Sequence, residues 1–215
     1  MRILTLLILA LIAPLAAPTQ GRARDIAGQF DYYVLALSWQ PSWCAATGDA
    51  RGAPECAAGD GRGFTIHGLW PQHERGWPQY CDTAERDPSR RDSQAMADVM
   101  GSGGLAWHQW QKHGRCSGLS AADYYATTRK AGEAIALPPA LTAPPRDTRL
   151  SPGRIEAAFL AANPDLNPDG VTITCRDGAL SEVRICLTRE LTPRLCAPDV
   201  RRDCRSRNLS VPAIR

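Results

Sequence analysis

The sequence predicts an α+β fold, on three observations. Segments with strand-like patterns lie toward both ends of the chain, and segments with helical patterns are grouped between them. The 215 residues suit one domain. Eight cysteines, an even number, follow an apolar N-terminal segment, as in disulfide-stapled exported proteins. With 44% apolar and 22% charged residues, the chain does not have the composition of a disordered, collagen-like or multi-pass membrane protein.

The N-terminal segment has the pattern of a secretory signal peptide. Met1 and Arg2 precede the uncharged apolar run 3–13, and small residues follow Pro14. We expect residues 1–23 to be this signal, cleaved at a position between 17 and 23. Residues 24–215 are then one exported domain, periplasmic or extracellular. An uncleaved anchor is the alternative, although the apolar run is short for a bilayer span.

Four segments are expected to be strands, because they are rich in apolar and aromatic residues or alternate with a period of two. They are 31–39, 64–70, 171–175 and 180–187. The last has the alternation of a half-buried strand, with Val183, Ile185 and Leu187 set against Glu182, Arg184 and Cys186.

Four segments show helical patterns, namely 93–100, 105–113, 121–136 and 152–162. The last has the clearest ends. Ser151 suits its N-cap, Pro152 its first turn, and Asn163 with Pro164 its stop. The proline-rich stretch 137–145 is expected to be a loop inside the domain.

The cysteines are expected to form disulfides rather than a metal or redox site, because the chain contains no CxxC pair. Eight cysteines allow 105 connectivities, and spacing alone does not choose among them. It favours closure of Cys44 with Cys56, and it favours pairing of the last four among themselves. The eight are Cys44, Cys56, Cys81, Cys116, Cys175, Cys186, Cys196 and Cys204.

Two segments carry candidate chemistry, and the first is FTIHGLWP at 64–71. On a regular strand, one face carries Phe64, Ile66 and Trp70, and the other carries Thr65, His67 and Leu69. Gly68 would let a ligand or another backbone approach His67 closely. We expect Pro71 to end the strand.

The second segment is WHQWQKHGRC at 107–116. On a helix, one polar arc carries two imidazoles, an ammonium and an amide, from His108, Gln109, Lys112 and His113. We expect Trp107 and Trp110 to point the other way, into a core. Gly114 would cap the helix just after His113.

This residue set suits acid–base chemistry on a phosphodiester. Two imidazoles with pKa values near 6.5 can take and give a proton in one reaction. Lysine and a further imidazole would neutralise charge on a phosphate. The cysteines are committed to disulfides, so they offer no nucleophile. Cleavage of RNA by its own 2′-hydroxyl needs such a site and no metal.

Both segments resemble the two signature segments of the ribonuclease T2 family of secreted endoribonucleases. The resemblance extends to residues 35–44, to residues 76–81 and to the C-terminal cysteine cluster, so it covers most of the chain after the signal. It implies a central antiparallel sheet flanked by helices and stapled by disulfides. It implies the pairs Cys44–Cys56, Cys81–Cys116, Cys175–Cys204 and Cys186–Cys196.

The resemblance also implies roles for single residues. His67 corresponds to the general acid of the transfer step, and His113 to the general base on the 2′-hydroxyl. Lys112 corresponds to the group that stabilises the phosphorane, His108 to a phosphate-binding residue and Trp70 to an aromatic that stacks on a base. The expected substrate is single-stranded RNA, cut through a 2′,3′-cyclic phosphate to 3′-phosphate ends.

Further expectations concern partners. No cofactor or metal is expected. Because the reaction needs a 2′-hydroxyl, we expect no cleavage of DNA, and we expect no stable DNA binding. The net charge of +3 is small, so RNA would be held locally and released. After signal removal we expect a monomer with no membrane contact.

Two positions depart from the family pattern. The family has glutamate where this chain has Gln109. A glutamine has no charge with which to bind an imidazolium, but its amide can donate a hydrogen bond. Some relatives have an acidic residue in the base pocket where this chain has Gln72, so base preference stays open. A plain surface glutamine is the alternative interpretation of Gln109. Trp77 and Tyr80 could stack on bases or pack around Cys81.

Two other classes of protein remain as alternatives. A secreted zinc hydrolase would use His67, His108 and His113, although His108 and His113 are five apart where a helical zinc pair needs four. An inactive relative that binds RNA or a protein partner is conceivable because of Gln109. The presence of both principal histidines and Lys112 argues against it.

Overall fold

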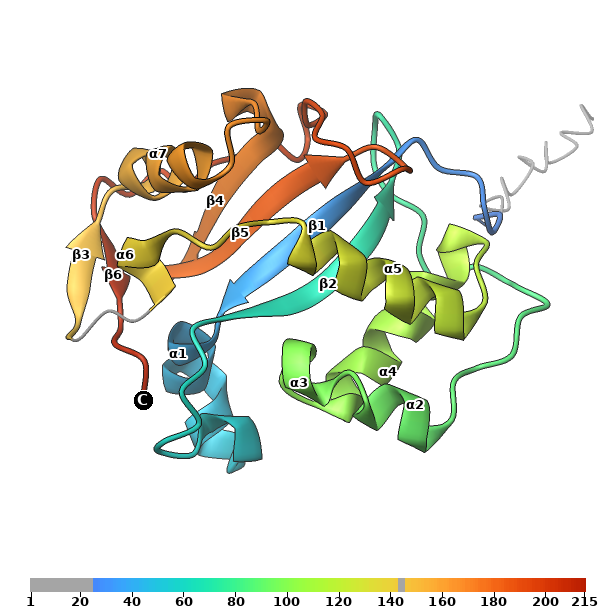
Figure 1. Cartoon of the computed structure of the whole chain (residues 1–215), viewed down its shortest axis with the longest axis horizontal. Coiled ribbons are helices and arrows are strands. Elements are labelled where there is room, and N and C mark those ends of the chain that lie inside the picture. The colour runs from blue at the N-terminus through green and yellow to red at the C-terminus, as the bar shows by residue number, and fades with distance from the viewer. Residues whose placement is uncertain (1–24, 143–145) are drawn as a thin grey trace, which may run out of the picture.

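The computed structural model describes residues 25–142 and 146–215. The predicted signal peptide and positions 143–145 of the expected proline-rich loop lie outside these residues. In the described chain a six-stranded sheet has the order β2-β1-β5-β6-β3, with β4 paired to β5 (Figure 1). The strands are β1 (Tyr32–Trp39), β2 (Phe64–Gln72), β3 (Thr148–Leu150), β4 (Val171–Arg176), β5 (Ala179–Leu187) and β6 (Leu209–Val211).

The pairing confirms the predicted α+β class with a central antiparallel sheet. β1 is antiparallel to both β2 and β5, and β4 is antiparallel to β5. The one parallel contact in the described sheet joins Ala179 of β5 to Ser210 of β6. The four predicted strands correspond to β1, β2, β4 and β5. The short strands β3 and β6 were not predicted, because three residues are too few for a visible alternation.

The helices are grouped mainly between β2 and β4. They are α1 (Gln40–Trp43), α2 (Arg90–Gln94), α3 (Ala97–Met100), α4 (Gly103–Lys112), α5 (Ala121–Glu133), α6 (Pro139–Thr142) and α7 (Pro152–Ala162). The last has the predicted bounds, and the Ser151 side chain accepts a hydrogen bond from the backbone N–H of Arg154. Short α6 lies in the stretch expected to be a loop.

The single helix predicted over 93–100 is wrong, because the chain forms two short helices there. Ser89 and Asp92 form a reciprocal capping box, which starts α2 before Ser93. The helix is interrupted by a turn at Ala95 and Met96, where Met96 buries its side chain in the core, and α3 begins at the next residue. The capping box was visible in the sequence as Ser followed three residues later by Asp.

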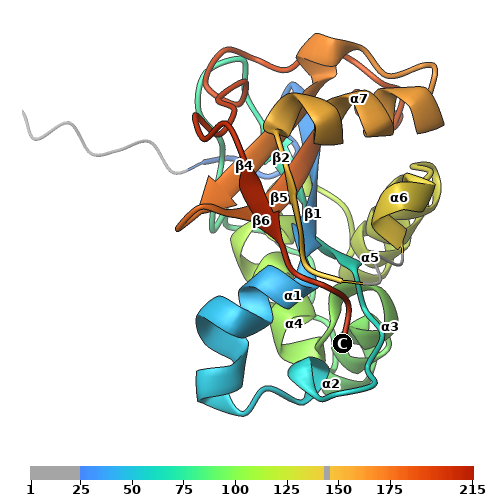
Figure 2. The same cartoon turned by 90° about the vertical axis from the view of Figure 1, so that its left-hand side faces the viewer.

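The main core lies between one face of the sheet and the helices. Figures 1 and 2 show α5 and α7 on the same face of the sheet. Tyr124 of α5, Phe159 of α7 and Trp110 of α4 are fully buried against Leu35 of β1 and Ile185 of β5. On the opposite face, a smaller apolar cluster is formed by Tyr32, Val34, Cys186, Cys196, Ala197 and Val200. The two faces of β1 are therefore both buried.

The pairing of β2 with β1 contains a β-bulge at His67. Ala36 of β1 pairs with Gly68, and the next residue, Leu37, pairs with Ile66, so His67 is an extra residue on β2. Two residues of β2 therefore stand opposite one residue of β1. Such a bulge re-aims side chains and interrupts the alternation of the strand.

The bulge makes the predicted division of β2 into two faces wrong. We expected Ile66 with Trp70 on one face and His67 with Leu69 on the other. Instead, Ile66 and Leu69 both pack in the main core, whereas Trp70 packs against the smaller cluster on the opposite face. The side chains of His67 and Trp70 consequently meet on the same side of the sheet, with their ring centroids 5.3 Å apart.

The expectation that Pro71 ends the strand is also wrong. β2 continues through Pro71, which pairs with Tyr33, to Gln72. Proline has no N–H to donate, and β2 is the edge strand of the described sheet, where no further strand requires one. The strand therefore delivers one more residue, Gln72, to the face that carries His67 and Trp70.

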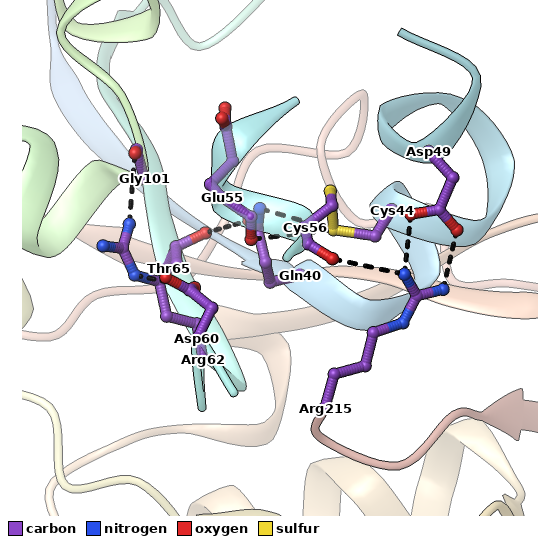
Figure 3. The surroundings of a disulfide bond; sticks show 10 residues. All are labelled: Gln40, Cys44, Asp49, Glu55, Cys56, Asp60, Arg62, Thr65, Gly101 and Arg215. Carbon is purple, nitrogen blue, oxygen red and sulfur yellow. Dashed lines mark hydrogen bonds and ion pairs between the residues drawn. A yellow bond between two sulfur atoms is a disulfide. The ribbon is translucent and has the colours of Figure 1, made fainter. Parts of the chain in front are cut away.

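The four disulfides pair as the resemblance implies, and all eight cysteines are used. Cys44–Cys56 closes the segment after β1, and Arg215 near the chain end donates to both the carboxylate of Asp49 and the carbonyl oxygen of Cys56 (Figure 3). Cys81–Cys116 joins the loop after β2 to the turn after α4. Within the described residues, no helix is long and apolar enough to cross a membrane.

Candidate active site

A pocket with a volume of about 360 Å³ opens on the face of the sheet that carries the bulge. It is formed by β2, α4, β5 and the C-terminal loop. The structure brings together here all seven residues predicted for catalysis or substrate binding: His67, Trp70, Gln72, His108, Gln109, Lys112 and His113. The other lining residues are Val34, Trp77, Glu182, Arg184, Asp199 and Val200.

The two principal imidazoles come from the bulge of β2 and from the end of α4. His67 Nδ1 lies 2.5 Å from Oε1 of Glu182. His113 is the C-cap residue of α4 and is 5% exposed. Its ring stacks on that of Trp70, with centroids 5.3 Å apart and an interplanar angle of 27°. Both imidazoles therefore contact the same indole and line the same pocket.

The expectation that Gly114 caps α4 is wrong, since the C-cap residue is His113. The φ of Gly114 is not positive, so it is not a left-handed cap. A side chain at this position would place Cβ 2.5 Å from the ring of Trp110 and 2.8 Å from that of Tyr124. The chain enters a 3-10 turn, Gly114–Ser117, and the left-handed glycine is Gly118 at its end. Close packing, rather than backbone freedom, requires the glycine beside His113.

Burial and charge set the proton affinity of the imidazoles on α4. Burial, followed by the positive charge of Lys112 and the neighbouring imidazoles, lowers the pKa of His113 to about 3. Burial and the charge of Lys112 also lower the pKa of His108 below its ordinary value. Nδ1 of His113 is buried and has no hydrogen-bond partner among the described residues. The ring of His113 is therefore a neutral proton acceptor at neutral pH.

Trp70 lies at the centre of the site. Its Nε1 donates a hydrogen bond to Oε1 of Gln109 at 2.8 Å, and the guanidinium of Arg184 lies 5.2 Å from the centroid of its ring. A Cβ on Gly68 would lie 2.3 Å from Gln109 Oε1 and 2.4 Å from Trp70 Nε1. The glycine thus makes room for this hydrogen bond.

Gln109 is not a surface residue, since it is 2% exposed. Its side-chain oxygen is occupied by Trp70, and a glutamate would offer the same acceptor. Gln72 is also buried, and its side-chain amide donates to the carbonyl oxygen of Pro71 at 3.1 Å. Both glutamines line the pocket while making hydrogen bonds within the protein.

Trp107 contradicts the prediction that both tryptophans of α4 point into a core. Trp110 is fully buried, and its Nε1 donates to Asp87 Oδ1 at 2.8 Å. Trp107 is 36% exposed and lines a second pocket beside α2. The buried stripe of α4 runs through Gly103, Ala106 and Trp110, and Trp107 lies at its edge.

The loop after β2 forms a rim beside the pocket. Gly76 N–H donates to Asp199 Oδ2 at 2.7 Å, and Tyr80 N–H donates to the carbonyl oxygen of Lys112 at 2.8 Å. Trp77 lines the pocket, whereas Tyr80 does not, and both side chains are exposed. The alternative that they pack around Cys81 does not hold for these exposed rings. The loop ties the end of α4 to the C-terminal segment.

Sequence reasoning missed Glu182 and Arg184 as site residues. Both come from the alternating strand β5 and lie on the face that also buries Cys186. We treated that face as the outer side of a half-buried strand. A usable signal was present, because an acid and an arginine two residues apart share a face with a disulfide cysteine. Among the described residues, no group of three or more His, Cys, Asp and Glu side chains is arranged to hold a metal ion.

The sequence and the fold both have counterparts in known proteins. The model of the Ribonuclease T2 family matches residues 30–196. A ribonuclease of Aeromonas hydrophila is 34% identical over 211 residues, which cover 89% of each chain. A solved RNase-related protein from Calystegia sepium matches 87% of this chain and 99% of its own, with a TM-score of 0.68 at 19% identity. RNase NT in complex with 5′-AMP matches 86% of this chain and 100% of its own, with a TM-score of 0.62 at 22% identity. The chain belongs to the ribonuclease T2 family, a family of RNA-cleaving endoribonucleases.

Proposed function

We propose that this endoribonuclease cleaves single-stranded RNA without a metal, by transphosphorylation through a 2′,3′-cyclic phosphate to 3′-phosphate ends. One observation carries the proposal. Two imidazoles from different elements, His67 and His113, contact the same indole in a pocket that Lys112 and His108 also line. The substrate supplies its own nucleophile, so the protein needs groups that move protons and stabilise charge.

His113 acts as the general base in the first step. Its ring is neutral at neutral pH, because burial and the nearby cations oppose a second proton. A phosphodiester anion in the pocket offsets the charge of Lys112 and increases the proton affinity of His113. His113 then takes the proton of the 2′-hydroxyl, and the 2′-oxygen attacks phosphorus.

His67 acts as the general acid in the same step. As the bond from phosphorus to the 5′-oxygen breaks, the His67 imidazolium gives its proton to that oxygen. In the second step the roles reverse: His67 takes a proton from water, the water oxygen attacks the cyclic phosphate, and His113 returns a proton to the 2′-oxygen. The product ends in a 3′-phosphate.

Lys112 and His108 hold the phosphate and its developing charge. They lie one helical turn apart on α4 and both line the pocket. The positive charge of the Lys112 ammonium stabilises the additional negative charge of the phosphorane. His108 donates a hydrogen bond to a non-bridging phosphate oxygen.

Trp70 and Gln72 bind the base 5′ to the cut. A base stacked on an indole gains about 1–3 kcal/mol. Trp77, exposed in the rim of the same pocket, supplies a second aromatic surface. The 5′-AMP complex of RNase NT supports nucleotide binding in this fold.

We propose that the chain acts as a monomer.

The compartment follows from the cysteines and the N-terminal pattern. Residues 1–23 act as a signal peptide, and 24–215 are the exported catalytic domain, in the periplasm or outside the cell. All eight cysteines form disulfides, which persist in oxidising compartments. Mass spectrometry of the protein exported from the full chain measures the new N-terminus, which we expect between residues 18 and 24. A mature protein that begins at Met1 would contradict this proposal.

End-group analysis of cleaved oligoribonucleotides tests the mechanism. The wild type is expected to give 2′,3′-cyclic phosphate and then 3′-phosphate ends, in the presence of EDTA and without cleavage of the matching DNA. His67→Ala and His113→Ala are expected to lose at least about 10²-fold in rate. His73→Ala is the matched control, because His73 is half-exposed outside the pocket, 3.9 Å from Asp31. Direct 5′-phosphate ends would exclude the mechanism, and no cleavage at all would favour the binding-protein alternative.

A further inference from the structure

Glu182 is a buried carboxylate in the middle of β5 that the proposed mechanism does not use. It pairs with Ser38 of β1 and with Thr174 of β4, so its backbone is held from both sides. Its backbone N–H donates to the side-chain oxygen of Thr174 at 3.1 Å. The residue is 6% exposed. A carboxylate held so firmly has a fixed position relative to its neighbours.

Each oxygen of the Glu182 carboxylate has a different partner. Oε1 lies 2.5 Å from Nδ1 of His67. Oε2 accepts from Arg184 twice, from Nε at 2.9 Å and from a terminal nitrogen at 2.8 Å. The guanidinium of Arg184 in turn lies over Trp70. Glu182 is therefore held by Arg184 on one side while it holds His67 on the other.

The carboxylate is ionised despite its burial. Burial by itself raises the pKa of Glu182, but the hydrogen bond and charge of His67, together with Arg184, outweigh it, so the pKa lies below its ordinary value. An ionised carboxylate accepts hydrogen bonds and donates none. Nδ1 of His67 must therefore carry the proton of this contact, and Nε2 is left to meet the substrate.

The two imidazoles of the site differ in this respect. Nδ1 of His113 has no hydrogen-bond partner among the described residues, and burial keeps that ring neutral. His67 has an anionic partner at Nδ1, the carboxylate of Glu182. Gln109 gives neither ring a charge, because it is an amide whose oxygen accepts from Trp70. The structure thus places an anion beside the imidazole that must start the reaction protonated.

We propose that Glu182 is a positioning residue for His67: it fixes the ring through Nδ1, so that Nε2–H points to the departing 5′-oxygen. This inference rests on the proposed function of His67 as general acid. Arg184 orients the carboxylate and keeps it from turning away. Since position 109 holds an uncharged amide, β5 supplies the carboxylate that acts on an imidazole in this pocket.

The leaving group of the substrate separates this role from a purely structural one. A 5′-alkoxide needs a proton to leave, whereas 4-nitrophenolate leaves without one. Two substrates are compared at one pH: a dinucleoside phosphate, and the nucleoside 3′-(4-nitrophenyl phosphate) with the same first base. Loss of the acid or of its alignment lowers kcat on the first substrate and spares the second.

For Glu182→Gln we expect kcat on the dinucleoside phosphate to fall by at least about 10²-fold, the usual contribution of an acid–base group. On the 4-nitrophenyl ester we expect a fall of less than about threefold. Glu190→Gln, an exposed residue just after β5, is the matched control and is expected to change neither rate. Equal losses on both substrates would show a structural role for Glu182 and overturn the proposal.

His67→Ala, measured with the same two substrates, tells the two proposals apart. If this variant loses activity equally on both substrates, His67 is not the general acid, and the inference about Glu182 fails as well. If His67→Ala is selective and Glu182→Gln is not, the inference alone fails.

Glu182→Asp covers the case in which the glutamine variant does not fold. It keeps the charge for Arg184 but withdraws the carboxylate from His67, so the same selective loss is expected.

Discussion

The indole N–H of Trp70 donates to the side-chain oxygen of Gln109 at 2.8 Å, and this bond joins the two sequence motifs of the site. Trp70 comes from β2 and Gln109 from α4. Because an amide and a carboxylate both offer an acceptor oxygen, the bond tolerates the replacement of glutamate by glutamine at this position. The departure from the family pattern therefore removes a charge without removing the link between strand and helix.

Gln109→Leu is expected to lower the free energy of unfolding by about 1–3 kcal/mol, because it leaves the buried N–H of Trp70 without an acceptor. Gln109→Glu keeps the acceptor, and Lys112 lines the same pocket, so we expect turnover to change by less than tenfold. Urea denaturation and steady-state kinetics measure the two effects. A drop of tenfold or more in the glutamate variant would mean that the amide N–H group has a role of its own.

Gly68→Ala is expected to destabilise the protein by about 1–3 kcal/mol, through overpacking, and to lower activity at least about tenfold. The new Cβ would lie 2.3 Å from Gln109 Oε1 and would push the amide away from Trp70. Gly104→Ala is the control within α4, because nothing lies within 4 Å of its Cβ position. Alanine there is expected to leave activity unchanged and to stabilise the helix by up to about 1 kcal/mol. Unchanged stability and activity in Gly68→Ala would show that the strand shifts to make room for the new methyl group.

The two tryptophans of α4 are expected to respond differently to alanine. Trp110→Ala removes a fully buried ring and is expected to cost about 3–5 kcal/mol. Trp107→Ala removes a ring that is 36% exposed and is expected to cost less than about 1 kcal/mol, with activity retained. Thermal and urea unfolding of both variants measure the difference. Similar losses would mean that Trp107 packs as the sequence pattern first suggested.

His113 is expected to make stability depend on pH in the acid range. Its pKa is lowered from 6.5 to about 3 in the folded protein, so the unfolded chain binds more protons between these values. The free energy of unfolding is therefore unaffected by protonation of His113 above about pH 6.5, and it falls as the pH falls toward 3. Between pH 7 and about pH 4.5 the wild type is expected to lose about 2–3 kcal/mol more than His113→Asn. Parallel urea curves for the two proteins would contradict the lowered pKa.

The local patterns of the chain predicted most of its elements. Alternation and apolar composition located β1, β4 and β5, and the cap at Ser151 located α7 with its correct ends. The motif regions predicted seven of the residues that line the pocket, because a strand and a helix each present a short polar set to one side. These features depend on residues near one another in the chain, so the sequence alone carries them.

The features that were missed depend on contacts between distant segments. The bulge at His67 is a property of the pairing between β1 and β2. Glu182 becomes a site residue only because β5 lies beside β1, which places its carboxylate within reach of His67. Trp107 is partly exposed in a pocket that residues of α2 also line, so its surroundings depend on how α2 packs beside α4. None of these relations leaves a periodic signal within one segment.

The single extra residue in β2 has a consequence for how this protein can vary. If the same residues of β2 paired with β1 without the bulge, every residue after His67 would lie on the opposite face of the sheet. Leu69 would then point to the solvent side and Trp70 into the core. Deleting either His67 or Gly68 would remove the bulge and leave Leu69 and Trp70 on their present faces, but the strand would lose the imidazole or the space that Gly68 leaves for the bond between Trp70 and Gln109. The number of residues in β2 is therefore as much a part of the site as the identity of its histidine.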